Sequence, residues 1–305
     1  MIWVGWRQQR TEAAIAVAIL ALLAAVLVPT GLQMASAYHH DGLSACTGGP
    51  SIEGPCGQAV GAFFARFDQI GNFIAWLTLV PGIIGILLAA PLLVQLEQGT
   101  YRLDWTQSIT RGRWIAGKLG LAIGAALAAS LALTLLITWW RAPFVHLQGR
   151  MENSVFDSEG IVVFGYTLFA LGLAAVVGVI WRRAVPALVV AFVGYFAARL
   201  FVDTWLRQRL VDPLTITWKS SGREPAALNH AWVLSEGPVG QAGHRFAVPS
   251  PGAKQAANAI PTQFEAVYHP ASHFWSLQII ETALFGGIAL GLLAFAAWWI
   301  HERIA

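Results

Sequence analysis

Charged residues are scarce in this sequence. Only 11% of its 305 residues are Asp, Glu, Lys or Arg, whereas 56% are hydrophobic. A soluble domain carries about 25% charged residues. The net charge is only +3 and the basic residues are scattered along the chain, so a nucleic-acid partner is not predicted. The composition instead predicts a polytopic membrane protein.

Catalytic and metal-binding motifs are also missing. The sequence contains no H-E-x-x-H, no paired Cys motif and no G-x-S-x-G. A His-His-Asp triplet begins at His39, but adjacent residues rarely converge on one ion, so we expect no metal site. The string GRWIAGK at 112–118 imitates a phosphate-binding loop, yet Leu119 stands where that loop needs Ser or Thr. We therefore expect no enzyme activity and no cofactor in this chain.

Cysteine is limited to Cys46 and Cys56, which are separated by a turn rich in Gly and Pro. That turn would let the two sulfurs meet in a disulfide. Two free thiols are the alternative, because the geometry of the pair does not follow from the sequence.

Six apolar stretches are long enough to cross a bilayer, which takes about 20 residues in a helix. They are Ala13 to Met34, Ile70 to Leu96, Ile115 to Trp140, Ile161 to Trp181, Pro186 to Val202, and Phe274 to Ile300. Residues 1–12 precede the first of them and predict an amphipathic helix at the membrane interface, with Trp3, Trp6, Arg7 and Arg10 at the headgroups. The chain is thus predicted to be an all-α membrane protein.

Six spans place both termini on one side, and charge assigns that side. The short segments there hold most of the basic residues, namely Arg7, Arg10, Arg102, Arg111, Arg113, Lys118, Arg182, Arg183 and Arg303. The short opposite loops hold Arg66, Arg141 and Arg150. By the positive-inside rule both termini are cytoplasmic, which places the two cysteines outside the cytosol, where a disulfide is permitted.

Four units follow from this topology: an interfacial helix over 1–12, five spans over 13–203, a large extracytoplasmic segment over 204–272, and the last span with its tail over 273–305. The extracytoplasmic segment is punctuated by Pro and Gly but also rich in aromatic residues. We expect a small ordered cap with short helices. A disordered loop is the alternative.

A polar island interrupts the apolar runs between Leu92 and Lys118. It mixes both charge signs more tightly than any other stretch between the first and last spans. Its apolar residues favour a short interfacial helix within a cytoplasmic segment at 95–114, with an ordinary loop as the alternative.

Polar residues and glycines inside the spans suggest contacts. Glu281 is the carboxylate within a span, so it is read either as a group in a proton or substrate pathway or as a structural hydrogen-bonding residue. Arg199 and Asp203 lie one turn apart and are expected to pair. Five glycines are expected to pack against neighbouring helices within the subunit, with a dimer contact as the alternative: Gly117, Gly120, Gly124, Gly287 and Gly291.

Two cytoplasmic segments resemble a known family. The element W-x-x-W-R-Q-x-R starts at Trp3, and E-x-G-T-x-R-L-x-x-T-Q-S-x-T-R-x-R-W runs from Glu97 to Trp114. With six spans and cytoplasmic termini, they resemble actinobacterial ABC-2 type transporter permeases. The resemblance implies a coupling helix after the second span that docks on a separate ATPase. The matching positions are Glu97, Gly99, Thr100, Arg102, Thr106, Gln107, Thr110 and Arg111.

The expected function is that of a permease subunit in an ABC-2 exporter. It would pair with a second permease, forming a homodimer or a heterodimer, and with two ATPase subunits that bind ATP and Mg. Arg182 and Arg183 would add a second contact to the ATPase. Lipids, hydrophobic antibiotics and peptides all suit a pathway lined by aromatic residues, for which the candidates are Phe73, Trp76, Tyr195 and Phe196.

Two other classes stay open. A proton-coupled secondary transporter would use Glu281 as its coupling group. A membrane anchor or sensor would bind a ligand at the cap and recruit a cytoplasmic protein at the polar island.

Overall fold

The computed structural model describes residues 2–46, 55–102, 110–151, 156–220, 222, 224–239 and 263–303; for 2–13 and 68–75 it describes the backbone. The main helices are α1 (Ile2–His40), α2 (Pro55–Leu77), α3 (Val80–Gln98), α5 (Arg111–Gln148), α7 (Val162–Trp181), α8 (Ala184–Phe201) and α9 (Phe274–Arg303). The strands are β1 (Leu214–Lys219), β2 (Trp232–Val239) and β3 (Gln263–His269). Short helical turns complete the described elements: η1 (Leu43–Ala45), η2 (Val202–Leu206), η3 (Arg207–Arg209), η4 (Ala226–Leu228) and η5 (Ala271–His273).

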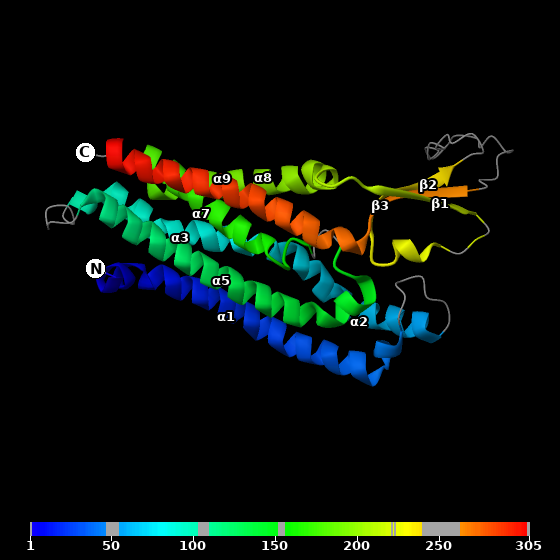
Figure 1. Cartoon of the computed structure of the whole chain (residues 1–305). Coiled ribbons are helices and arrows are strands. Elements are labelled where there is room, and N and C mark those ends of the chain that lie inside the picture. Colours follow the sequence, from blue (N-terminus) through cyan, green and yellow to red (C-terminus); the bar gives the residue numbers. More distant parts are fainter. Residues whose placement is uncertain are drawn as a thin grey trace, which may run out of the picture.

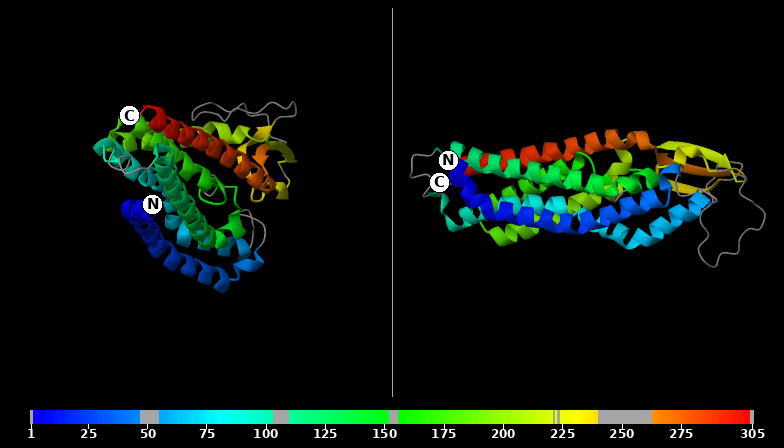
Figure 2. Two further views of the ribbon diagram at one scale, coloured as in Figure 1. Left: turned by 60° about the vertical axis from the view of Figure 1, so that its left-hand side comes forward. Right: turned by 90° about the horizontal axis from the view of Figure 1, so that it is seen from below.

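Within the described residues, six helical segments are long and apolar enough to cross a membrane. They lie side by side in a bundle, with both chain ends at one end and the sheet at the other (Figure 1). We call these the termini end and the cap end. Figure 2 shows the same separation from below. The prediction of an all-α membrane protein is confirmed for the bundle.

Helix α7 forms the centre of the bundle and packs against α3, α5, α8 and α9. Its sequence allows this because small residues alternate with large apolar ones. A Cβ on Gly85 of α3 would lie 2.3 Å from the Thr167 carbonyl oxygen of α7, and one on Gly178 of α7 would lie 2.3 Å from the Leu93 side chain of α3. Both glycines thus permit the close approach of the two most buried helices.

The second predicted span is divided in the structure. Helix α2 ends at Leu77, α3 begins at Val80, and Thr78 and Leu79 form the break between them. Pro81 explains the break, because it has no N–H to donate to the carbonyl of Leu77 four residues earlier. In contrast, the predicted interfacial helix over 1–12 is continuous with the first span as α1.

The cap contains an antiparallel sheet in the order β1-β3-β2, where short helices were expected. The described part of the cap does have the short 3-10 helices η4 and η5 beside the sheet, but the sheet itself was not predicted. Alternate residues of β3 explain the sheet, since Phe264, Ala266 and Tyr268 project to one face. Ala266 and Tyr268 are buried there against Leu228 and Val233.

His269 lies at the end of β3, close to the start of α9, and its lowered pKa predicts that the stability of the protein depends on pH. His269 is buried beside Trp232, with its Nδ1 3.3 Å from Nδ1 of His273. Burial lowers the pKa of His269 in the folded protein. The neutral imidazole therefore stabilises the fold above the unfolded pKa of about 6.5, and this stability is lost as the pH falls through the lowered pKa of the folded state. The thermal unfolding midpoint should therefore drop from pH 7 to pH 5, and less so in His269→Gln. The exposed residue His39, changed to Gln, is the control; an equal drop in wild type and His269→Gln would contradict the assignment.

The prediction that glycines of α5 and α9 pack against neighbouring helices within the subunit is wrong. A Cβ added at Gly117, Gly120, Gly124, Gly287 or Gly291 would meet no atom within 4 Å. These glycines therefore face outward, whereas glycines of α1, α3, α7 and α8 lie against side chains or backbone of neighbouring helices.

Candidate functional site

The termini end carries the predicted coupling residues. The Glu97 carboxylate, in the last turn of α3, accepts a hydrogen bond of 2.9 Å from the backbone N–H of Ala184. Ala184 is the first residue of α8, so an acidic group satisfies an N–H that has no partner within its own helix. Gly99 then ends α3 with φ at 69°, a conformation that glycine adopts without strain. The end of α3 and the start of α8 are thereby joined.

Exposed arginines surround this junction. Arg102, Arg111, Arg182 and Arg183 are all exposed, as are Thr100 and Thr110. Arg111 also reaches α9, where its Nη1 lies 3.5 Å from the carbonyl oxygen of His301. Thr106 and Gln107 lie outside the described residues, as do the side chains of Trp3, Trp6, Arg7 and Arg10.

A cluster of buried charges lies toward the cap end of α7, α8 and α9, and we call it the ionic cluster. Glu281 is fully buried and accepts hydrogen bonds from Tyr166 at 2.5 Å, Arg199 at 3.2 Å and Arg207 at 2.9 Å. Both arginines also pair with Asp157, and Arg199 does so at 2.5 Å. Buried charges of this kind are stable only when they are paired, and the network supplies that pairing.

Local helix geometry brings the arginines of α8 to the cluster. The helix changes to a π-helix over η2, which shifts the following turn and directs Arg207 inward. Asp203 pairs with Arg207 at 2.7 Å. The predicted pairing of Arg199 with Asp203 is therefore wrong, since Arg199 pairs with Asp157 and Glu281 instead. A single π-helical turn is common at functional sites.

Asp157 is held by a loop that folds back into the bundle. Gln278 of α9 donates to the carbonyl oxygens of Phe156 and Glu159 at 3.0 and 3.1 Å, and accepts from the Val162 N–H at 2.9 Å. Glu159 also pairs with buried Arg141 at 3.3 Å. Burial raises the pKa of Glu159, although the neighbouring guanidinium groups act in the opposite direction.

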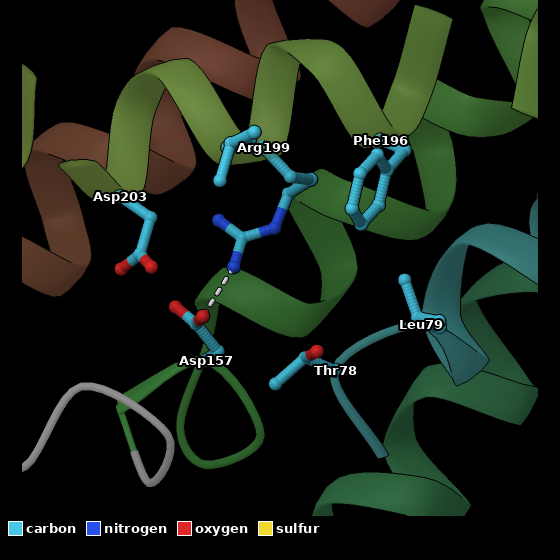
Figure 3. A pocket seen from close by; sticks show the side chains of 7 residues that line it. Thr78, Leu79, Asp157, Phe196, Arg199 and Asp203 are labelled. Atoms are coloured by element: carbon cyan, nitrogen blue, oxygen red, sulfur yellow. Dashed lines mark ion pairs between the residues drawn. The ribbon is translucent and has the colours of Figure 1, made fainter. Parts of the chain in front are cut away.

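A small pocket of about 90 Å³ opens beside the ionic cluster. Its lining comes from the α2–α3 break, the folded-back loop and α8: Thr78, Leu79, Asp157, Phe196, Arg199, Leu200 and Asp203. Figure 3 shows the Arg199–Asp157 ion pair at this pocket, with Asp203 beside it and Phe196 farther along α8.

The predicted pathway residues fall in different environments. Tyr195 is buried, and its hydroxyl donates to the Thr78 carbonyl oxygen at 3.3 Å. Phe196 lines the pocket and is 48% exposed, and Trp76 is 68% exposed. Glu281 belongs to the ionic cluster. The side chain of Phe73 lies outside the described residues.

The two cysteines are joined at the cap end. Cys46 and Cys56 form a disulfide with their Cα atoms 5.6 Å apart. It links the turn that follows α1 to the first turn of α2.

Three members of the cluster were not predicted from the sequence, namely Asp157, Tyr166 and Arg207. One local signal was present, because Arg199, Asp203 and Arg207 recur every four residues and so mark a charged face at the end of α8. Asp157 had no such signal, since its ion-pair partners Arg199 and Arg207 are 42 and 50 residues away.

Comparison with known proteins identifies the family. A family model described as "ABC-2 membrane transporter related" matches residues 17–207, which is more than half of the chain and includes α3, α5, α7 and α8. No curated protein and no solved structure gives a match. The matched region contains the Glu97–Ala184 junction and most of the ionic cluster. The chain is therefore a multi-pass membrane subunit that belongs to the ABC-2 membrane transporter related family.

Proposed function

We propose that this chain is the permease subunit of an ABC-2 exporter in the cytoplasmic membrane, driven by a separate ATPase. The termini end faces the cytoplasm, in keeping with its exposed arginines. Two ATPase subunits supply ATP and Mg, and a second permease, identical to this one or related to it, completes the transporter. The chain itself carries no catalytic role, and cargo moves outward.

The observation that carries this proposal is the Glu97–Ala184 hydrogen bond. It joins the element preceding the coupling segment to the start of α8, so a push on that segment by an ATPase moves α3 and α8 together. The far end of α8 carries Arg199 and lines the pocket, and the adjoining turn carries Arg207. Motion at the cytoplasmic end is thereby delivered to the outer half of the bundle, as rigid helices transmit such shifts.

The ionic cluster does not favour proton-coupled transport. Both oxygens of Glu281 are engaged by Arg199, Arg207 and Tyr166. This arrangement supports the structural interpretation of Glu281. Transport that persists after ATP depletion and is lost in Glu281→Gln would support the proton-coupled alternative instead.

Glu97→Ala is the test of the coupling proposal. A hydrogen bond to a charged group contributes about 1.5 to 3 kcal/mol, so its loss should lower assembly with the co-expressed ABC ATPase about tenfold or more. Co-purification and ATP turnover of the complex measure this, with Arg102→Ala as a second variant. Glu302→Ala is the matched control, because Glu302 is exposed at the same end and pairs with its neighbour His301. Unchanged assembly and turnover in both test variants would refute the coupling role.

A further inference from the structure

The pocket beside the ionic cluster has an unequal balance of charge. Three carboxylates meet there, those of Asp157, Asp203 and Glu281, against the guanidinium groups of Arg199 and Arg207. With all five groups ionised, one negative charge is in excess. Nearby, Glu159 pairs with two guanidinium groups, that of Arg141 at 3.3 Å and that of Arg150 at 3.9 Å.

Asp203 is the carboxylate that presents this excess negative charge to the pocket. Its side chain is 31% exposed, whereas those of Asp157 and Glu281 are at most 6% exposed. It pairs with Arg207 through one oxygen, Oδ1. An ionised carboxylate has about four lone-pair sites, so Asp203 has capacity for another donor.

The pocket lining favours a ligand that donates hydrogen bonds over a ligand that accepts them. The oxygens of Asp157 and Asp203 are hydrogen-bond acceptors, and the hydroxyl of Thr78 can accept as well as donate. The charged donor in the lining is Arg199, and its guanidinium is already engaged by Asp157 and Glu281. A group with several N–H donors and one positive charge therefore matches the lining better than an anion.

The rest of the lining is apolar and faces outward. Leu200 and Phe196 are about half exposed on α8, and Leu79 contributes from the α2–α3 break. Arg199 and Asp203 lie about 23 to 29 Å along the helix from Ala184, which is close to the thickness of a hydrocarbon core of about 30 Å. The pocket thus lies at the membrane boundary toward the cap end, where a charged head and an apolar tail are both accommodated.

We propose that this pocket binds a primary ammonium group carried on an apolar tail, with Asp203 and Asp157 as its counter-ions. A pocket of about 90 Å³ holds such a head while the tail lies against Phe196 and Leu200. The proposal rests on the proposed function, because it names the chemical class of cargo for the exporter. The amine belongs either to a soluble amphiphile or to a lipid such as phosphatidylethanolamine.

Equilibrium dialysis of radiolabelled hexylamine tests the pocket, with the full chain in phosphatidylcholine nanodiscs. Hexylamine should bind, whereas hexanol and hexanoate should bind at least tenfold more weakly. Asp203→Asn should weaken hexylamine binding at least tenfold. Asp212→Asn should leave it within twofold, because Asp212 is exposed and lies outside the pocket. Leu200→Trp, which covers the mouth and keeps every charge, should weaken binding even if Asp203→Asn fails to fold.

The remaining outcomes are decisive. Binding that is equal for all three probes, strongest for hexanoate, or insensitive to both Asp203→Asn and Leu200→Trp would overturn the proposal. Phosphatidylethanolamine that displaces hexylamine supports a lipid source, and phosphatidylethanolamine without effect supports a soluble amphiphile. Co-purification with the ATPase separates the two proposals, since a chain that assembles normally but binds no amine refutes the pocket alone.

Discussion

Replacing Arg207 by methionine is expected to destabilise the bundle by about 3 to 5 kcal/mol, the usual cost of removing one partner from a buried ion pair. Arg207 is fully buried and contacts Asp157, Asp203 and Glu281. Methionine keeps much of the volume but leaves three carboxylates facing one guanidinium group. Denaturant titration of the protein in detergent or nanodiscs measures the change in the free energy of unfolding.

Arg209 provides the matched control for this variant. It is exposed two residues further along, where its guanidinium stacks on Trp205 4.5 Å from the ring centroid. Arg209→Met should therefore cost less than about 1 kcal/mol. Combining Arg207→Met with Glu281→Gln should recover part of the lost stability, because one unpaired carboxylate is removed with the cation. If Arg207→Met were as stable as Arg209→Met, the ionic cluster would not hold the outer end of the bundle together.

Replacing Gly85 by leucine is expected to cost about 3 kcal/mol, near the upper end for an overpacked core. A Cβ at this position lies 2.3 Å from the Thr167 carbonyl oxygen and 3.0 Å from the Cβ of Ala170. The first of these neighbours is backbone of α7 and cannot move aside like the end of a flexible side chain. Helices α3 and α7 must separate to admit the new side chain.

Gly117→Leu on α5 is the control for Gly85→Leu. Both substitutions replace a helical glycine with a better helix former, which by itself stabilises by up to about 1 kcal/mol. A Cβ at Gly117 meets nothing within 4 Å, so its replacement should be neutral or stabilising. Thermal unfolding of both variants measures the difference. Equal midpoints would show that the α3–α7 contact does not depend on a glycine at position 85.

The ionic cluster and the Glu97–Ala184 junction together suggest how α8 serves transport. One end of the helix is fixed to the element that precedes the coupling segment, and its other end is fixed to α9 and to the loop around Asp157. Because both ends of α8 are tied to neighbouring elements, a shift of α3 at the termini end reaches the ionic cluster through α8. This arrangement supports the proposal that α8 links the ATPase to the pocket.

The sequence by itself determined the membrane class and the bundle of apolar helices, because these depend on the length and composition of local runs. Glu97 was singled out from the sequence because it lies in a polar segment between two such runs, and the structure places it at the α3–α8 junction. The break at Thr78 and Leu79 has a local cause in Pro81, although one continuous span was predicted over this region. The sheet of the cap was missed because Gly237 and Pro238 within β2, and the Pro and Gly residues between the strands, were read as turns.

Only the tertiary structure decided which charges meet and which glycines pack. Asp157, Arg199, Arg207 and Glu281 come from separate parts of the chain, and their pairing depends on how α7, α8 and α9 cross. In the same way, Gly85 packs tightly whereas Gly117 faces outward, although both lie in apolar helices. The physical reason is that hydropathy fixes whether a helix is buried in the membrane, while the rotation of each helix about its axis is set by contacts with its neighbours.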